Sequence, residues 1–260
     1  MDRTAQLTAS DYYLVESTRE WPRRIPGGVV HEEDGLLLVA GTTTDLSYLV
    51  RTGTQPAPSA AATLERAASF FGPLGLGYSV ITRRHADADL EQALEAAGYQ
   101  LTGDRPAMVL EHAVEGRDPG PGAVLRRVQD TQGMSDFAVV ASEAMPDWGG
   151  VALAIFGEPF SLFGMPNAIG YVAYVDDQPA SATMVLVVGS VAGIDWVATR
   201  HEYRGRGLGE AVTRASVNAG FELGARIAAL QAEPKAESLY RRVGFFSVSS
   251  YRWYACPSAG

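Results

Sequence analysis

The chain has 260 residues, 47% of them hydrophobic and 20% charged, which is a composition typical of a globular protein with a sizeable core. Its formal net charge of −9 argues against general nucleic-acid binding, which needs a basic face, and its single cysteine excludes an internal disulfide. Because no apolar run reaches the roughly 18 residues of a membrane span and the polar start MDRTAQLTAS does not resemble a secretory signal, we expect a cytoplasmic protein without membrane contact.

The first part of the chain alternates between short apolar runs and stretches whose apolar side chains recur three and four residues apart. The runs predict strands, and the spaced stretches predict helices. In the second helix Leu90 and Leu94 belong to the apolar stripe, while Asp87 can cap the start and Gly98 can end it. The predicted elements are a strand at 35–40, a strand at 47–52, a helix at 59–72, a strand at 76–82, a helix at 87–99 and a strand at 106–112.

The clearest break in the chain is the segment EGRDPGPGAV, residues 115–124. Its closely spaced prolines and glycines predict an irregular connection. Each side of it retains enough residues for a small domain. We therefore expect a boundary near residue 120, with one domain over 1–118 and a second over 119–260.

The second half predicts grouped strands followed by alternating helices and strands. Two short turns, DDQP at 176–179 and GSV at 189–191, join three strands as hairpins. This order favours an α/β fold of the α+β kind, a mixed sheet with helices packed on it. The predicted elements are strands at 123–128, 169–175, 180–188, 192–199, 225–232 and 245–255, and helices at 135–145, after Gly209 and at 235–244.

Three glycines at alternate positions lie where one of these helices begins, in the stretch RGRGLG at 204–209. The first N–H groups of a helix lack intrahelical partners, and the helix dipole is positive there. Glycines let an anion approach these groups, and Arg204 and Arg206 add forked cationic donors suited to phosphate. The stretch therefore predicts a diphosphate site, although an ordinary glycine-rich turn remains the alternative.

Two familiar phosphate cradles fit this stretch poorly. A P-loop requires Gly-Lys-Ser/Thr, and the stretch contains no lysine. A dinucleotide fingerprint requires G-x-G-x-x-G after the first strand of a βαβ unit, and its third glycine falls here at Glu210. A dinucleotide-binding oxidoreductase is thus disfavoured, but it is kept as one possible function. Saturable binding of NAD would reveal it.

Another pattern fits better. Arg204, Gly207 and Gly209 form R-x-x-G-x-G, and the run VATRHEYRGRGLG resembles the acyl-CoA-binding signature of the GNAT N-acetyltransferase superfamily. That family commonly carries a second motif, N-x-x-A-x-x-L-Y-x-x-x-G-F. The matching positions in this chain are Glu233, Ala236, Leu239, Tyr240, Gly244 and Phe245. The two motifs extend the resemblance over residues 123–255 and imply the GNAT-type acyl-CoA N-acyltransferase fold.

A fainter likeness links the two halves of the chain. LEQALEAAGYQ and AESLYRRVGFF both read as a helix that ends in glycine and an aromatic residue, followed by a strand. Such internal similarity indicates degenerate copies of one fold. The resemblance then implies two tandem GNAT copies, of which the N-terminal one lacks the R-x-x-G-x-G loop.

The resemblance also implies roles for individual residues at the cofactor. Backbone N–H groups of the glycine loop would bind the CoA diphosphate, and the backbone of the preceding strand would bond the pantetheine arm and polarise the thioester carbonyl. Glu233 replaces the usual asparagine, either as a harmless exchange or as a carboxylate near the acceptor amine. The implied cofactor-binding residues are Trp196, Val197, Ala198, Thr199, Arg204, Gly205, Arg206, Gly207, Leu208, Gly209, Glu233 and Ala236.

The catalytic residues implied are Tyr240 and Asp195. Tyr240 matches the tyrosine that protonates the leaving CoA thiolate, although a packed core tyrosine would read the same. A base must take a proton from the amine, and Asp195 is the acidic residue of the strand before the loop; Glu143 and Asp147 are further candidates. Strand alternation would place Asp195 and Trp196 on opposite faces.

The expected function is therefore transfer of an acetyl group from acetyl-CoA to a primary amine by direct attack. The alternative is an acyl-CoA-binding sensor or interaction module without transferase activity. The histidines show no spacing typical of metal ligands, so no metal is expected. The acceptor and the oligomeric state, including a homodimer, stay open.

Overall fold

The computed structural model describes residues 1–24, 27–145, 149–156, 163 and 165–257. The chain divides into two compact units. The N-terminal unit comprises Arg3–Ala107 with Ser247–Gly260, and the C-terminal unit comprises Met108–Phe246 with Met1–Asp2. The end of the chain thus belongs to the N-terminal unit, whereas we expected one boundary near residue 120. The functional domains 1–118 and 119–260 stay a prediction.

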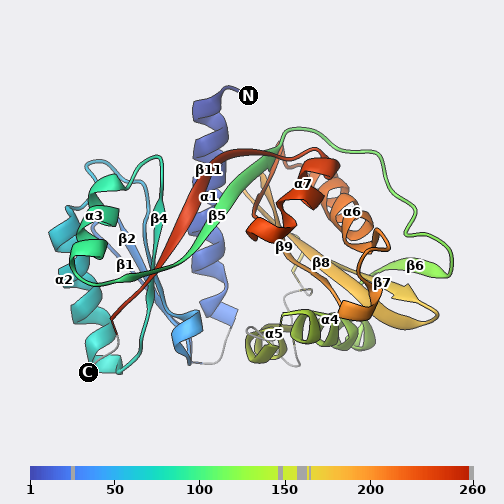
Figure 1. The fold of residues 1–260 in the computed structure, drawn as a ribbon, viewed down its shortest axis with the longest axis horizontal. Coiled ribbons are helices and arrows are strands. Elements are labelled where there is room, and N and C mark those ends of the chain that lie inside the picture. The colour runs from blue at the N-terminus through green and yellow to red at the C-terminus, as the bar shows by residue number, and fades with distance from the viewer. Residues whose placement is uncertain (25–26, 146–148, 157–162, 164, 258–260) are drawn as a thin grey trace. The chain divides into compact units, whose positions relative to one another are not determined.

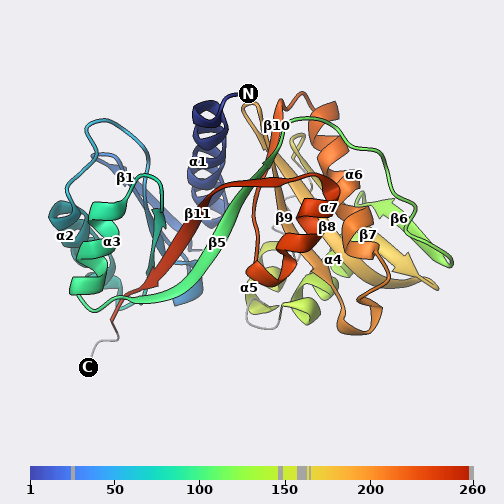
Figure 2. The ribbon, with the colours of Figure 1, turned by 45° about the horizontal axis from the view of Figure 1, so that its top comes forward.

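The N-terminal unit packs helices on a sheet (Figures 1 and 2). Alternation along the strands supplies its core, because Leu38, Phe71 and Leu94 meet on the face that α2 and α3 cover. β11 completes this sheet by pairing antiparallel with β4. Its elements are α1 (Arg3–Glu20), β1 (Val29–Glu33), β2 (Leu36–Ala40), β3 (Tyr48–Arg51), α2 (Ala60–Phe71), β4 (Ser79–Arg83), α3 (Ala88–Ala96), most of β5 (Gln100–Leu110) and β11 (Phe246–Ala255).

The C-terminal unit has helices on both faces of its sheet, α4 and α5 on one and α6 and α7 on the other (Figure 1). The apolar stripe of α6, which includes Leu208, Val212 and Val217, is buried against β7, β8 and β9. Its elements are β6 (Ala123–Arg127), α4 (Thr131–Ala144), α5 (Gly149–Phe156), β7 (Ala168–Val175), β8 (Gln178–Val188), β9 (Val191–Thr199), α6 (Leu208–Glu222), β10 (Ile227–Gln231) and α7 (Glu237–Val243).

The strands of the described residues form one 11-stranded sheet, in the order β1-β2-β3-β4-β11-β5-β10-β9-β8-β7-β6. β1, β2 and β3 pair antiparallel, and β3 pairs parallel with β4. The same order recurs in β7, β8 and β9, which pair antiparallel before β9 pairs parallel with β10. The predicted mixed sheet of an α+β fold is confirmed. Two tandem copies of one fold remain a prediction.

Local turn chemistry explains the hairpins. Asp176 and Asp177 both have positive φ in the turn between β7 and β8, as a two-residue primed turn requires, so the predicted hairpin at DDQP is confirmed. Asp34 and Gly35 form an equivalent turn between β1 and β2. The Asp-Gly pair was therefore an unused signal for β1.

Two helices and one capping contact differ from expectation. The sequence analysis did not predict α1 or α5. The buried face of α1 includes Ser10, Ser17 and Thr18, so its buried and exposed faces differ little in hydrophobicity. Asp87 does precede α3, but its carboxylate accepts hydrogen bonds from Arg83 and makes no capping bond. The predicted N-cap position of Asp87 is confirmed, but the buried Arg83 takes the carboxylate that a side-chain cap would need.

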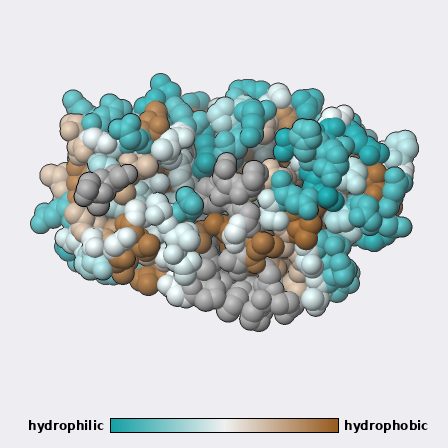
Figure 3. Space-filling model, turned by 60° about the horizontal axis from the view of Figure 1, so that its bottom comes forward, coloured by the Kyte–Doolittle hydropathy of each residue, from teal (hydrophilic) through white to brown (hydrophobic). Residues whose placement is uncertain are grey.

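The large hydrophobic side chains on the surface are dispersed. Figure 3 shows one face, where hydrophobic residues gather in small patches between polar ones. Among the described residues the exposed ones come from many different elements, and scattered single residues of this kind are ordinary for a protein surface. They are Met1, Tyr12, Val29, Leu74, Leu101, Val124, Leu153, Leu223 and Phe246.

Candidate active site

The candidate site begins where two parallel strands part. The ladder of β9 and β10 starts at Val191 opposite Ile227 and ends, within the described chain, at Gly193 opposite Ala229. Both strands continue beyond that last pair. We call the opening between them the fork. The residues predicted to bond the pantetheine arm, 196–199, lie on its β9 side.

A bulge marks the same part of β9. Ala182 of β8 lies opposite Ala198 and Met184 lies opposite Asp195, so two residues of β9 face one residue of β8. Trp196, the first of the two, has a φ of 53°, in the left-handed region that non-glycine residues seldom adopt. The simple alternation that we assumed for Asp195 and Trp196 is therefore interrupted at Trp196. Bulges often re-aim side chains next to functional sites.

Neighbouring side chains hold this bulged segment in place. The indole of Trp196 meets the ring of Phe156 edge-on, with centroids 5.1 Å apart. The carbonyl of Ala198 accepts a hydrogen bond from Ser181 Oγ at 2.7 Å. Thr199 Oγ1 lies 2.8 Å from the same hydroxyl. The side of β9 that faces β8 is thus firmly anchored, and the fork opens on the other side.

The glycine loop lies at the end of β9 and leads into α6. Gly205 and Gly207 have φ values of 79° and 83°, so both need glycine for backbone reasons. Leu208 is buried and fixes the start of the helix. The first helical hydrogen bond runs from Ala211 N to Gly207 O, which leaves the N–H groups before Ala211 outside the helical ladder. Gly207 caps the helix without a side-chain bond, as an anion-binding helix start requires.

The third glycine, Gly209, is needed for space. A Cβ atom there would lie 3.1 Å from Leu239 Cδ1 on α7 and 3.3 Å from Thr199 Oγ1 at the end of β9. Helix α6, helix α7 and β9 therefore approach one another closely at this point. The sequence analysis explained these glycines by the approach of an anion, and it did not predict this close packing of protein elements at Gly209.

The two loop arginines bind nearby groups of the protein. Arg204 donates to the carbonyl of Thr199 at 3.1 Å and to that of Ala144, the last residue of α4, at 3.4 Å. Its guanidinium thus ties the end of β9 to a helix C-terminus, where positive charge is favoured. Arg206 lies with its Cζ 5.9 Å from the ring centroid of Tyr203. Both side chains flank the loop, while phosphate binding by them stays a prediction.

Tyr240, on α7, belongs to the buried cluster that also contains Ile194 of β9 and Leu230 of β10. Its ring is 7% exposed and meets that of Phe245 edge-on at 6.1 Å. Burial raises the pKa of the Tyr240 phenol, and the carboxylates of Asp195 and Glu233 raise it further. These carboxylates come from β9 and from the residues just after β10, so both arms of the fork place a negative charge near the phenol. The other residues packed on this cluster include Val197, Ala236 and Leu239.

The candidate bases differ in their surroundings. Asp195 is half-buried and Glu233 is exposed, and both act electrostatically on the same phenol. Glu143, the further candidate on α4, forms an ion pair with Arg200 at 2.6 Å. Asp147 lies outside the described residues. The fold therefore brings Asp195 and Glu233 together at the fork and commits Glu143 to an arginine.

Part of the apolar stretch before β7 forms an aromatic cluster. Phe156, at the end of α5, is fully buried and lies 4.5 Å from the ring of Phe137 and 5.5 Å from that of Phe163. With Trp196 on the other side, these rings join the bulge of β9 to α4 and α5. Phe156 thus packs into the core of the C-terminal unit.

One basic residue at the glycine loop escaped the sequence patterns. Arg117, in the segment read as a linker, forms an ion pair with Glu210 at 2.9 Å and lies against Gly207. A lone arginine among glycines and prolines carries no motif. Only the path of the connecting segment along α6 brings it to the loop.

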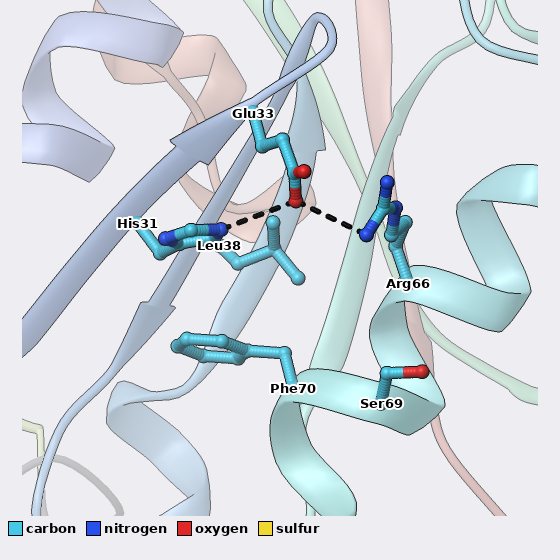
Figure 4. A pocket seen from close by; sticks show the side chains of 6 residues that line it. All are labelled: His31, Glu33, Leu38, Arg66, Ser69 and Phe70. Carbon is cyan, nitrogen blue, oxygen red and sulfur yellow. Dashed lines mark hydrogen bonds and ion pairs between the residues drawn. The ribbon is translucent and has the colours of Figure 1, made fainter.

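A separate hollow lies in the N-terminal unit, between β1, β2 and α2 (Figure 4). Its volume of about 190 Å³ is below the roughly 300 Å³ of typical ligand pockets. Glu33 lies 3.4 Å from His31 Nε2 and 3.2 Å from Arg66 Nη1, so the polar groups that line the hollow already contact one another. The lining residues are His31, Glu33, Leu38, Arg66, Ser69 and Phe70.

Two kinds of feature are absent from the described part of the chain. It contains no group of three or more histidine, cysteine, aspartate or glutamate residues placed to hold a metal ion. None of its helices combines the length and the apolar character that crossing a membrane requires.

The chain resembles known proteins in sequence and in structure. A family model described as "Acetyltransferase (GNAT) family" matches residues 140–245, which include the fork, the glycine loop and Tyr240. No curated protein matches the chain. Among solved structures, the GCN5-related N-acetyltransferase from Kribbella flavida aligns with a TM-score of 0.74 and 18% identity, over 95% of this chain and 96% of that chain.

Two other solved structures share the fold over most of the chain. The GCN5-related N-acetyltransferase from Sphaerobacter thermophilus has a TM-score of 0.60 and 15% identity, over 85% of this chain and 80% of that one. A tandem GNAT protein from the clavulanic acid biosynthesis pathway has a TM-score of 0.63 and 13% identity, over 90% and 86%. Residues 140–245 are therefore similar to the GNAT acetyltransferase family, and the chain as a whole has an α+β GNAT-like fold.

Proposed function

We propose that this protein is an N-acetyltransferase that passes the acetyl group of acetyl-CoA directly to a primary amine. The observation that carries the proposal is the fork between β9 and β10, with a glycine-lined helix start after β9 and a buried tyrosine packed in one cluster with residues of both strands. A cosubstrate with a diphosphate and a long arm that carries amide groups fits such a site. The diphosphate suits the start of α6, and the open edge of β9 suits the amides.

The residues of the fork supply the steps of the transfer. A backbone N–H at 196–199 polarises the thioester carbonyl as the neutral amine attacks its carbon. The carbon–sulfur bond breaks, and Tyr240 donates its proton to the sulfur. A carboxylate, Asp195 or Glu233, takes a proton from the attacking nitrogen, directly or through water. The raised pKa keeps Tyr240 protonated at neutral pH, as a proton donor must be.

Two measurements test this function. Calorimetry on the whole chain should show saturable binding of acetyl-CoA and none of NAD, because the glycine spacing departs from the dinucleotide fingerprint at Glu210. A thiol-release assay with acetyl-CoA and a panel of primary amines should then show turnover with at least one amine. NAD binding without acetyl-CoA binding would contradict the proposal.

A second candidate function is an acyl-CoA sensor or interaction module. The fork between β9 and β10 supports acyl-CoA binding in this function too, but a sensor requires no proton donor. Acetyl-CoA binding without thiol release over the whole amine panel would support it. Equal turnover after Asp195→Asn and Glu233→Gln together would show that neither carboxylate is the base.

We also propose that the two halves are copies of one fold. The recurring strand order, three antiparallel strands followed by a parallel one, supports this. The N-terminal copy, which lacks the glycine loop, would then not bind CoA. A cytoplasmic location and a homodimer remain predictions.

A further inference from the structure

The segment that connects β5 to β6 is fastened along one face of α6. Figures 1 and 2 show it passing beside this helix. The helix residues that hold it are spaced four apart, so they share one face. The contacts run from Val114 N to Asn218 Oδ1 at 2.9 Å, from Arg214 Nη1 to Glu115 O at 3.1 Å and from Arg117 Nη1 to Glu210 Oε2 at 2.9 Å. We call residues 114–117 the strap.

The strap ends on the glycine loop. A Cβ atom at Gly207 would lie 2.7 Å from Arg117 Nη2 and 3.3 Å from its Cζ, so the guanidinium lies directly against the bare backbone of Gly207. Gly207 is the residue that caps α6. The Arg117 side chain remains 46% exposed, which leaves part of its guanidinium open to solvent beside the helix start.

The charge around the strap favours an anion. Glu210, in the first turn of α6, is buried and would by itself repel a phosphate. Burial opposes its ionisation, but hydrogen bonds from Arg214 and Arg117 outweigh burial and lower the pKa of Glu210. Arg242 lies 3.5 Å from the same carboxylate. Three cations against one anion leave two positive charges in excess at the helix start.

Arg117 differs from Arg214 and Arg242 in the hydrogen bonds and ion pairs that it makes. Arg214 donates to the backbone carbonyls of Glu115 and Arg242 as well as to Glu210. Arg242 donates to the carbonyl of Ser238. Arg117 uses Nη1 for Glu210 and turns Nη2 toward the loop. A guanidinium that offers a second donor face is suited to a phosphate oxygen.

We propose that Arg117 binds a phosphate group of CoA, from the strap and outside the glycine-loop motif. This inference rests on the proposed function. The CoA molecule offers two such groups, the diphosphate and the 3′-phosphate, and both share the chemistry that a guanidinium recognises.

The test is calorimetry on the full chain with acetyl-CoA and with acetyl-dephospho-CoA, which lacks the 3′-phosphate. Arg117→Gln should raise the Kd for acetyl-CoA by about tenfold or more, as expected for a lost hydrogen bond to a charged group. An equal loss on both ligands identifies the diphosphate as the partner, and a loss on acetyl-CoA alone identifies the 3′-phosphate. The matched control is Arg126→Gln. It removes an exposed arginine of β6 that pairs with Asp177, and it should leave both Kd values unchanged.

A second variant separates direct binding from charge balance. If Arg117 only neutralises Glu210, the double variant Arg117→Gln/Glu210→Gln should regain wild-type affinity, and this result would overturn the proposal. If Arg117 touches the phosphate, the double variant should remain weaker than Glu210→Gln alone. A Kd for Arg117→Gln within twofold of wild type on both ligands would also overturn it. Failure of the wild-type chain to bind acetyl-CoA would instead contradict the proposed function.

Discussion

Replacement of Tyr240 by phenylalanine removes one buried hydroxyl near Asp195 and Glu233. The ring itself is 7% exposed and packs against Phe245, and phenylalanine keeps those contacts. The free energy of unfolding should therefore change by about 1 kcal/mol or less. Any larger effect on turnover then reports chemistry rather than folding.

The size of the kinetic effect follows from the acidity of the phenol. General acid catalysis contributes roughly 10²–10⁴ in rate. The pKa of Tyr240 is raised above its ordinary value, so the phenol is a weaker acid than the leaving thiol, whose pKa is about 8.5 on the cysteine scale. Proton donation is then less favourable, and we expect the low end, a loss of about 10²-fold in kcat, or about 2.7 kcal/mol.

The assay is thiol release from acetyl-CoA with an amine on which the wild-type chain turns over. Tyr174→Phe is the matched control, because Tyr174 is also 7% exposed but its hydroxyl donates to Asp136, at 2.7 Å on α4. The control should lose stability and keep kcat. A Tyr240→Phe variant within twofold of wild type in kcat, with an unchanged Tm, would refute the role of Tyr240 as proton donor.

Three further predictions concern binding, packing and pH. Gly209→Val should weaken acetyl-CoA binding about tenfold or more in calorimetry, because even its Cβ would lie 3.1 Å from Leu239 Cδ1; an unchanged Kd would show that this approach does not shape the site. Phe137→Ala, at a fully buried position, should cost about 3–5 kcal/mol in urea unfolding, and a cost below about 1 kcal/mol would contradict its place in the aromatic cluster. Burial opposes the charge of Asp87, but Arg83 outweighs it and lowers the pKa of Asp87, so its stabilisation is present above the unfolded-state pKa of about 3.9 and is lost as the pH falls through the folded-state value. Asp87→Asn should therefore cost about 3 kcal/mol at pH 7 and progressively less below pH ~4; a cost that does not decrease as the pH falls below about 4 would argue against the ion pair.

Much of the site was readable in the sequence because its signals are local. The glycines, the apolar stripe of α6 and the turn at Asp176 and Asp177 each depend on a few consecutive residues. Helical period and turn chemistry act over that range, so a single sequence reveals them. Where a signal was weak, as in the polar buried face of α1, or passed over, as in the Asp-Gly turn before β2, an element was missed.

The sequence by itself determined the helix start, its glycines and the succession of strands and hairpins along the chain in the C-terminal unit. Only the tertiary structure decided that β11 pairs with β4 in the N-terminal unit, that Asp87 serves Arg83 and that Arg117 lies on Gly207. The physical reason is the distance along the sequence over which each interaction acts. Local conformation follows from neighbouring residues, whereas these contacts join segments whose meeting depends on the whole packed sheet, which no periodicity within a segment records.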